Sequence, residues 1–343
     1  MKLEDLFSAI SDISREKKID YDVLIDAIKQ GLLAAYKKTW SDSKNLRIDV
    51  NDKEKKIQVI ATKKVVRTVQ YPHTEVTYRK AKKLYPDVEI GEEVDIEVTP
   101  ESFGRFAAST CKQIIMQRLK EAKKQRIISE FDEKIKQIVF GEVSRVGSKG
   151  VYFTVGTSEG LLPKTEQIPG ERYFPGNKFH LFVLKLDKSS REPLIILSRT
   201  HPGLLQRLME QGIPEIEQGV IEILAVVREP GLRAKVAVRS LQERVDPVGS
   251  CIGTKGVRIN VVSDELKGER IDVVRWFEDP RLFIASSLSP ATVYSVQIIP
   301  EEKRAIVLVE HDQFSLAIGK KGSNVRLASR LTGFKIDMQE LED

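Results

Sequence analysis

The sequence predicts a multidomain α+β protein in which four modules follow one another along the chain. Three observations lead to this fold class. The chain opens with helix and strand patterns that end in one very long helix, and it continues with short strands separated by glycine turns. It closes with a motif that occurs twice, 66 residues apart. We place the four modules at residues 1–133, 134–199, 200–275 and 276–343.

Residues 1–133 predict a mixed helix and strand module. Helices are expected at residues 3–10 and 21–37, the second capped by Asp20 and carrying one apolar stripe. Alternating apolar residues predict three strands, at residues 46–50, 57–61 and 94–98.

The very long helix is expected between residues 102 and 133. A module of this size with neither a nucleotide-binding loop nor a catalytic cluster is more typical of a docking domain than of an enzyme. The helix carries six cations that we interpret as a solvated helix face, namely Lys112, Arg118, Lys120, Lys123, Lys124 and Arg126.

Residues 134–199 change to short strands and glycine turns, and five such strands predict a small OB-type barrel. Residues 147–150, Gly-Ser-Lys-Gly, should form a turn between two strands. Val151 and Phe153 alternate with Tyr152. We therefore expect Val151 and Phe153 in the barrel core and Tyr152 on its surface.

The repeated motif holds two glycines with a lysine between them. Ile-Gly-Thr-Lys-Gly occupies residues 252–256, and Ile-Gly-Lys-Lys-Gly occupies residues 318–322. Each copy follows a short apolar helical segment, continues with helical spacing and closes with a strand-like segment that begins Gly-x-x-Ile-Asp. Because two strands precede each copy, both are predicted to have the order α-β-β-α-α-β.

A glycine loop between two helices suits the phosphates of a nucleic acid. Glycine lets the backbone approach closely, and the N-terminus of the next helix adds partial positive charge. The alternative is that both loops are structural turns that bind nothing. We favour binding because both copies keep a lysine in the loop while the surrounding sequence differs. The candidate RNA-binding residues are Gly253, Thr254, Lys255, Gly256, Arg258, Gly319, Lys320, Lys321, Gly322, Asn324 and Arg326, with Lys149 and Tyr152 on the barrel.

The charge distribution indicates local binding sites of modest strength. The net charge of +6 divides into +3, +5, 0 and −2 over the four modules, whereas a protein that coats duplex DNA is usually more one-sided. Cys111 and Cys251 lie far apart without neighbouring histidines. This indicates a reducing compartment and no zinc site, so neither a metal nor a cofactor is expected.

Two further features favour a cytoplasmic protein without a membrane span. The first residues are too acidic and too weakly apolar for a secretory signal. Residues 282–300 carry no charge, but Pro290 and four serines among them argue against a membrane helix.

The glycine loops and their element order resemble KH domains of the bacterial type (type II), whose G-x-x-G loop clamps about four unpaired nucleotides. The barrel resembles the S1 RNA-binding fold. In that family two aromatic residues and a histidine commonly line the RNA face, where bases stack on the rings. The matching positions here are Lys149, Tyr152 and Pro163, so only one of the three residue types is kept.

An α+β module, an S1 barrel and two abutting KH domains together resemble the bacterial NusA family of transcription elongation factors. The stretches VDPVGSCIGTKG, at residues 245–256, and AIGKKGSNVRLASRLTG, at residues 317–333, are close to that family's own sequences. The resemblance implies that residues 1–126 bind the RNA polymerase core and that the S1 and KH domains hold nascent single-stranded RNA. Such a factor modulates pausing, intrinsic termination and antitermination.

The resemblance also implies a monomer that is not an enzyme, in the short form of the family without acidic C-terminal repeats. Other antitermination factors stay open as partners, and an RNA-binding accessory of RNA decay or translation stays open as the alternative function. A polynucleotide phosphorylase-like exonuclease is disfavoured, because it carries KH before S1 and needs a larger catalytic core than 133 residues can hold. A P-loop NTPase is disfavoured because neither glycine loop fits G-x-x-x-x-G-K-[ST].

Overall fold

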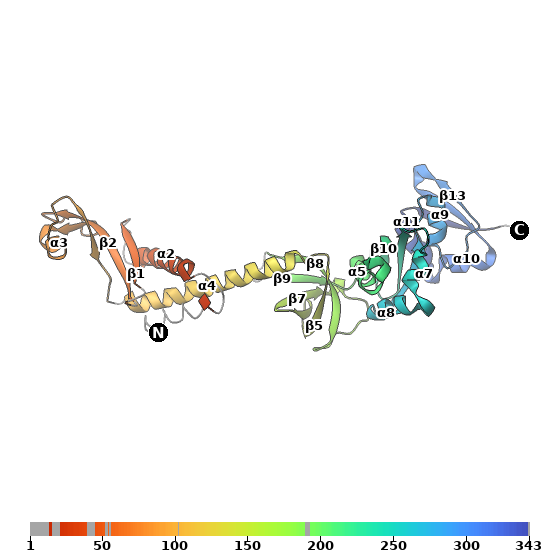
Figure 1. Cartoon of the computed structure of the whole chain (residues 1–343), viewed down its shortest axis with the longest axis horizontal. Coiled ribbons are helices and arrows are strands. Elements are labelled where there is room, and N and C mark those ends of the chain that lie inside the picture. The colour runs from red at the N-terminus through yellow and green to blue at the C-terminus, as the bar shows by residue number, and fades with distance from the viewer. Residues whose placement is uncertain are drawn as a thin grey trace. The chain divides into compact units, whose positions relative to one another are not determined.

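In the computed structural model the chain folds into two compact units, residues 1–126 and residues 127–343. Figure 1 shows the elements of both units. The helix predicted at residues 3–10 and the cap at Asp20 lie outside the described residues. The structure describes residues 14–15, 21–39, 45–51, 54, 56–101, 103–188 and 193–341.

The first unit packs helices against a four-stranded sheet in which β2 is central to the pairing. Strand β2 pairs with β1 and β4 in antiparallel fashion and with β3 in parallel. The elements are helices α2 (Tyr21–Thr39), α3 (Tyr78–Leu84) and α4 (Phe103–Asp132), and strands β1 (Leu46–Asn51), β2 (Lys56–Val66), β3 (Glu75–Thr77) and β4 (Glu93–Glu97).

The predicted stripe on α2 is confirmed as the core face of the first unit. Leu24, Ile28 and Leu32 are buried against Val59 of the sheet and Phe103 of α4. The strands predicted from alternation are confirmed as β1, β2 and β4, whereas β3 and α3 were not predicted. Strand β3 has only three residues, too few to show an alternating pattern.

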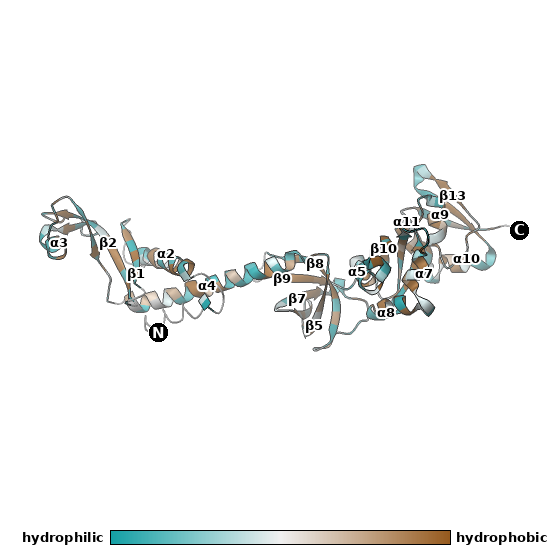
Figure 2. Ribbon diagram, in the orientation of Figure 1, coloured by the Kyte–Doolittle hydropathy of each residue, from teal (hydrophilic) through white to brown (hydrophobic). Residues whose placement is uncertain are grey.

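Helix α4 is confirmed as one long helix of 30 residues, in which hydrophilic and hydrophobic residues mix along the ribbon (Figure 2). Its first turns bury Ala107 and Cys111 in the core of the first unit. Its last residues belong to the second unit, because Ile127 and Phe131 lie in the hydrophobic core of the barrel. Lysines 112, 120 and 123 between these ends are exposed, as a solvated face requires.

The second unit begins with the predicted barrel. It is closed, in the strand order β5-β6-β7-β9-β8, which confirms the prediction of an OB-type barrel. Val151 and Phe153 are buried in its core as expected. The strands are β5 (Ile138–Val146), β6 (Gly150–Val155), β7 (Ser158–Pro163), β8 (Lys178–Asp187) and β9 (Leu194–Ser198).

Two domains with the same topology follow, each with a three-stranded sheet whose first pair is antiparallel and whose second pair is parallel. The predicted order α-β-β-α-α-β is confirmed in both, with one additional short helix, α6, after the first helix of the first domain. The first has α5 (Pro202–Gly212), α6 (Pro214–Glu217), β10 (Ile221–Glu229), β11 (Arg233–Ser240), α7 (Pro247–Ile252), α8 (Val257–Glu265) and β12 (Arg270–Arg275). The second has α9 (Pro280–Ser287), β13 (Ser295–Ile299), β14 (Arg304–Val309), α10 (His311–Ile318), α11 (Ser323–Thr332) and β15 (Lys335–Glu340).

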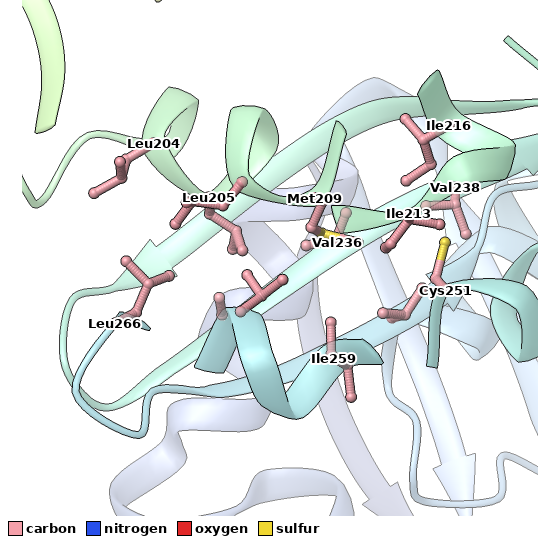
Figure 3. Packing of buried hydrophobic residues seen from close by; sticks show 14 of the residues in the cluster. Leu204, Leu205, Met209, Ile213, Ile216, Val236, Val238, Cys251, Ile259 and Leu266 are labelled. Carbon is pink, nitrogen blue, oxygen red and sulfur yellow. The ribbon is translucent and has the colours of Figure 1, made fainter. Parts of the chain in front are cut away.

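The core of the first of these domains lies between its helices and one face of its sheet (Figure 3). Met209 of α5, Val236 of β11 and Ile259 of α8 meet there. Cys251 lies in the same core, and burial raises the pKa of its thiol to about 12. This cysteine therefore acts as a small apolar core residue rather than a reactive thiol.

A separate apolar cluster, here called the interdomain core, joins the two repeated domains. Leu331 of α11 and Phe283 of α9, from the second domain, are buried with Ala237 and Val274 of the first domain's sheet. Trp276 and Phe277, in the short connection between the domains, pack against the same cluster. Because apolar packing fixes side chains closely, this cluster should hold the two domains in one orientation.

A buried ion pair fixes the junction between the barrel and the first repeated domain. The side chains of Arg228 and Glu269 are only 1% and 0% exposed and form two hydrogen bonds of 2.8 Å. Nη1 of Arg228 also donates to the carbonyl oxygens of Arg199 and His201, which follow the last barrel strand. The carbonyl oxygen of Arg228 accepts a hydrogen bond from Arg330 in the second domain. One residue thus contacts all three parts of the unit.

Substitution of Glu269 tests this junction. Glu269→Leu leaves the Arg228 guanidinium buried without its carboxylate, and we expect a loss of about 3–5 kcal/mol in the free energy of unfolding. Glu222→Leu removes the half-exposed partner of Arg239 and should cost less than about 1 kcal/mol. Urea unfolding of the 127–343 fragment, followed by Trp276 fluorescence, measures both. Equal costs for the two variants would contradict the assigned role of Glu269.

Lys235 adds a pH-dependent contact between the two repeated domains. Its side chain is fully buried, and Nζ donates to the carbonyl oxygen of Ser289 at 2.8 Å and lies 3.3 Å from the Asp272 carboxylate. Burial lowers the pKa of Lys235 from 10.5 to about 8.

The unfolded chain therefore binds more protons than the folded chain between pH 8 and pH 10.5, and stability should rise with pH in this window. Lys235→Met removes the titrating group while Asp272 keeps Arg233 as its partner. Between about pH 7.5 and pH 9.5 the free energy of unfolding of the wild type should rise by roughly 1–3 kcal/mol relative to that of this variant. Parallel profiles of unfolding free energy against pH would contradict the prediction. The cysteines are the same in the wild type and in Lys235→Met, so their contribution to the pH dependence cancels in the difference between the two proteins.

Candidate nucleic-acid interface

The two glycine loops have the same backbone conformation. The first glycine has φ and ψ of 73° and 171° at Gly253, and of 72° and 170° at Gly319. This region of backbone space is open essentially to glycine alone. The second glycine is left-handed in both copies, with φ of 78° at Gly256 and 72° at Gly322. The sequence repeat is therefore a repeat of local structure.

Each loop ends one helix and begins the next. The amides of Gly253 and Gly319 donate to carbonyl oxygens of the preceding helix at 2.9 Å, and the second glycine of each loop donates back to the first at 3.0 Å. Helices α8 and α11 then start at Val257 and Ser323. Their first-turn N–H groups and the positive end of the helix dipole therefore lie at the loop, where an anion is stabilised.

Three lysines supply full charges to the loops. Lys255, Lys320 and Lys321 are exposed, and none of them forms an ion pair with another residue that the structure describes. Lys255 and Lys321 adopt left-handed conformations with φ of 55° and 54°. This costs a non-glycine residue about 1–2 kcal/mol, so the loop geometry is kept at some cost to stability. Strain of this kind is typical of functional positions.

Asn324 is a predicted RNA contact whose side chain the structure places inside the domain. Its side chain is fully buried, and Nδ2 donates to the carbonyl oxygens of Leu288 and Ala317. Its Cβ also lies beneath the first glycine, since a Cβ added at Gly319 would lie 2.7 Å from it. Asn324 therefore supports the second loop from within the domain.

Arg258 occupies the matching position beneath the first loop. Nη1 donates to the carbonyl oxygen of Ser250 in the preceding helix and to the carboxylate of Glu215 at 2.9–3.0 Å. A Cβ added at Gly253 would lie 2.8 Å from its side chain. Arg258 is partly exposed, so its contact with RNA stays a prediction, but its charge is already paired.

Arg326 connects the second loop to the first repeated domain. Nε donates to Glu229 of β10 at 2.6 Å, and Nη1 donates to the carbonyl oxygen of Lys321 at 3.2 Å. The side chain stays half exposed. It holds the backbone of Lys321 against the neighbouring domain, in addition to any contact with a bound strand.

Sequence reasoning missed an apolar surface beside the first loop. Val257, Val261 and Val262 give the segment after the first loop its helical spacing, but only Val262 is buried. Val257 and Val261 are 63% and 66% exposed on α8. Their spacing of four residues places them on one helix face directly after Lys255 and Gly256. Helix geometry could have separated these residues at the sequence level. Val257 and Val261 lie about 40° apart around the helix axis and so share one face, whereas Val262 lies further round and can face the core.

On the barrel, Lys149 and Tyr152 lie where the sequence predicted. Lys149 is exposed in the turn closed by a hydrogen bond from Gly147 to Gly150. Tyr152 is half-buried, and the guanidinium carbon of Arg145 lies 3.4 Å from its ring centroid. One face of the only predicted stacking ring is therefore covered by an arginine, a contact that the sequence did not suggest.

The remaining features of the described residues concern metals and membranes. Among residues 14–15, 21–39, 45–51, 54, 56–101, 103–188 and 193–341, no group of three His, Cys, Asp or Glu side chains is arranged to hold a metal ion. Within the same residues, every helix is too short or too polar to cross a bilayer.

Comparison with known proteins matches both repeated domains and the first unit. Residues 5–125 match the NusA N-terminal domain, residues 199–276 the NusA-like first KH domain, and residues 280–343 the NusA-like second KH domain. The chain is 43% identical over 339 residues to the transcription termination/antitermination protein NusA of Bacillus subtilis, covering 99% of this chain and 91% of the relative. The chain belongs to the NusA family.

A second NusA protein aligns with the chain over a similar length. The NusA protein of Thermus thermophilus is 40% identical over 349 residues, covering 98% of this chain and 90% of the relative. The two glycine loops thus lie in the first and second KH domains, named KH1 and KH2 below.

The two glycines of a loop should differ in their tolerance of substitution. Gly319→Ala places a Cβ in a glycine-only conformation, 3.0 Å from the backbone nitrogen of Asn324, and should cost about 1–3 kcal/mol. At left-handed Gly322 an added Cβ meets its nearest atom only at 4.0 Å. Since asparagine tolerates this conformation, Gly322→Asn should cost less than about 1 kcal/mol. Urea unfolding compares the two variants. A Gly322→Asn cost as large as that of Gly319→Ala would be inconsistent with this geometry.

Proposed function

We propose that the two KH loops together bind nascent single-stranded RNA while residues 1–126 bind the RNA polymerase core. The protein then acts in the cytoplasm as a non-catalytic factor that modulates pausing, intrinsic termination and antitermination. The strongest support for this proposal is the geometry of the two loops. Two loops of identical backbone conformation present exposed lysines at helix N-termini, and the interdomain core joins their domains.

Docking by the first unit is supported by exposed apolar side chains. Tyr71, Leu84, Tyr85 and Ile90 are 40–66% exposed. Side chains of this kind are available to pack against another protein. An accessory role in RNA decay or translation has less support, because relatives aligned over nearly the whole chain are named as transcription termination/antitermination proteins.

Reversing the loop charge tests RNA binding. In the variants Thr254→Asp with Lys255→Asp, and Lys320→Asp with Lys321→Asp, two carboxylates replace the polar and cationic loop residues. Aspartate tolerates the left-handed conformation found at Lys255 and Lys321, so the fold should survive. Each double variant should bind single-stranded RNA tenfold more weakly or worse, about 1.4 kcal/mol, and the combined variant should not bind measurably.

Fluorescence anisotropy with labelled RNA measures this, and circular dichroism melts control for the fold. Polymerase binding through residues 1–126 should not change. Wild-type RNA affinity from a folded four-aspartate protein would show that the loops are structural turns.

Separating the two units tests the division of function. The 1–126 fragment should be retained on immobilised RNA polymerase core without RNA, and the 127–343 fragment should bind RNA without polymerase. The second fragment starts at residue 127 because Ile127 and Phe131 complete the barrel core. Retention of the 127–343 fragment on polymerase, with none of the 1–126 fragment, would refute this division.

A further inference from the structure

The barrel carries a second aromatic surface, away from Tyr152. Phe140 on β5 is 56% exposed and lies directly opposite His180 on β8 in the strand register. The two ring centroids are 5.2 Å apart with an angle of 60° between the planes. This arrangement leaves ring surface open to solvent, whereas the ring of Tyr152 is covered on one face by Arg145.

The pair lies at the edge of the contact between the barrel and KH1. Phe182, two residues beyond His180 on the same face of β8, is buried in the KH1 core cluster. Nδ1 of His180 lies 3.1 Å from Oε2 of Glu265, and the backbone amide of His180 donates to Oε1 of the same carboxylate. Glu265 thus holds the His180 side of the pair in place.

Glu265 is also the last residue of α8, the helix that starts at the first glycine loop. Exposed Val257 and Val261 lie four residues apart on this helix, and Glu265 follows at the same spacing. At 1.5 Å per residue, α8 covers about 12 Å from the loop to the barrel. Two exposed valines therefore lie on α8 between the lysine-bearing loop and the aromatic pair, with Asp264 and Glu265 at the barrel end of the helix.

Cationic side chains offset part of the negative charge along this path. The Glu265 carboxylate is matched by buried Arg199, whose Nη1 donates to it at 2.9 Å. Glu142, two residues beyond Phe140 on β5, lies 3.8 Å from Nζ of Lys178. Each of these two carboxylates therefore has a cationic neighbour, although Arg199 is shared with Glu171 and Asp264 adds an exposed carboxylate on α8.

We propose that Phe140 and His180 form a base-stacking site for the RNA strand held by the KH1 loop. This inference rests on the RNA-binding function proposed above and extends the RNA contact from KH1 onto β5 and β8 of the barrel. The ligand is any unpaired nucleobase, because aromatic stacking tolerates all four bases. Val257 and Val261 provide apolar contact along α8 between the loop and the rings.

The test compares RNA lengths in the full chain. Phe140→Ala should weaken binding of an unstructured RNA of about twelve nucleotides fivefold or more, and Phe140→Trp should restore it. A tetranucleotide, about the length that one KH loop clamps, should bind both variants like wild type. Phe174→Ala is the matched control, since Phe174 is also exposed on this module, at 58%, and should have no effect.

Photo-cross-linking with 5-iodouridine RNA gives an independent readout on the wild-type chain, with cross-links expected on peptides that contain Phe140 or His180. Wild-type affinity of Phe140→Ala for the long RNA, together with no cross-link there, would overturn the proposal. If the aspartate loop variants lose RNA binding in the same assay while Phe140→Ala does not, this inference alone fails. If the loop variants also keep full affinity, the proposed function fails.

Discussion

The buried ion pair of Arg228 and Glu269 is the interaction on which the arrangement of the second unit depends. Desolvation of the two charges is costly, and Arg228 offsets part of this cost by donating two hydrogen bonds to Glu269 and one each to the carbonyl oxygens of Arg199 and His201. Those acceptors come from the end of the barrel and from KH1, while the carbonyl oxygen of Arg228 accepts a hydrogen bond from KH2. The next residue, Glu229, accepts a hydrogen bond from Arg326 of KH2. The buried charge therefore favours one arrangement of the barrel and KH1, and the hydrogen bonds of Arg330 and Arg326 attach KH2 to the same strand.

That arrangement matters because each glycine loop alone offers little binding energy. A loop provides a few amides, a helix terminus and one or two lysines, and exposed charges are screened by salt. When two loops are held in a fixed relation, binding at the first raises the effective concentration of the strand at the second. The interdomain core around Leu331 and Phe283 provides that fixed relation. The modest net charge of the KH domains is consistent with binding that depends on geometry more than on charge.

Sequence reasoning predicted most of the architecture, because strand alternation and glycine spacing are local patterns. It predicted the closed barrel and the element order of the two repeated domains, and it missed β3 because three residues are too few to show an alternating pattern. It could not show that the Asn324 side chain is buried, since a polar residue beside a binding loop looks the same in sequence whether it faces solvent or supports the loop from below. It could not find the pair of Arg228 and Glu269, because partners 41 residues apart leave no pattern along the chain.

The central claim, that KH1 and KH2 present their loops in one fixed relation before RNA binds, can be tested by a distance measurement. Spin labels at Asp264→Cys in KH1 and Gln339→Cys in KH2 report on it, because both sites are exposed while the native Cys111 and Cys251 are buried. Pulsed electron–electron double resonance should give a single narrow distance distribution that does not change when RNA is added. A broad distribution in the free protein that narrows only with RNA would contradict the account.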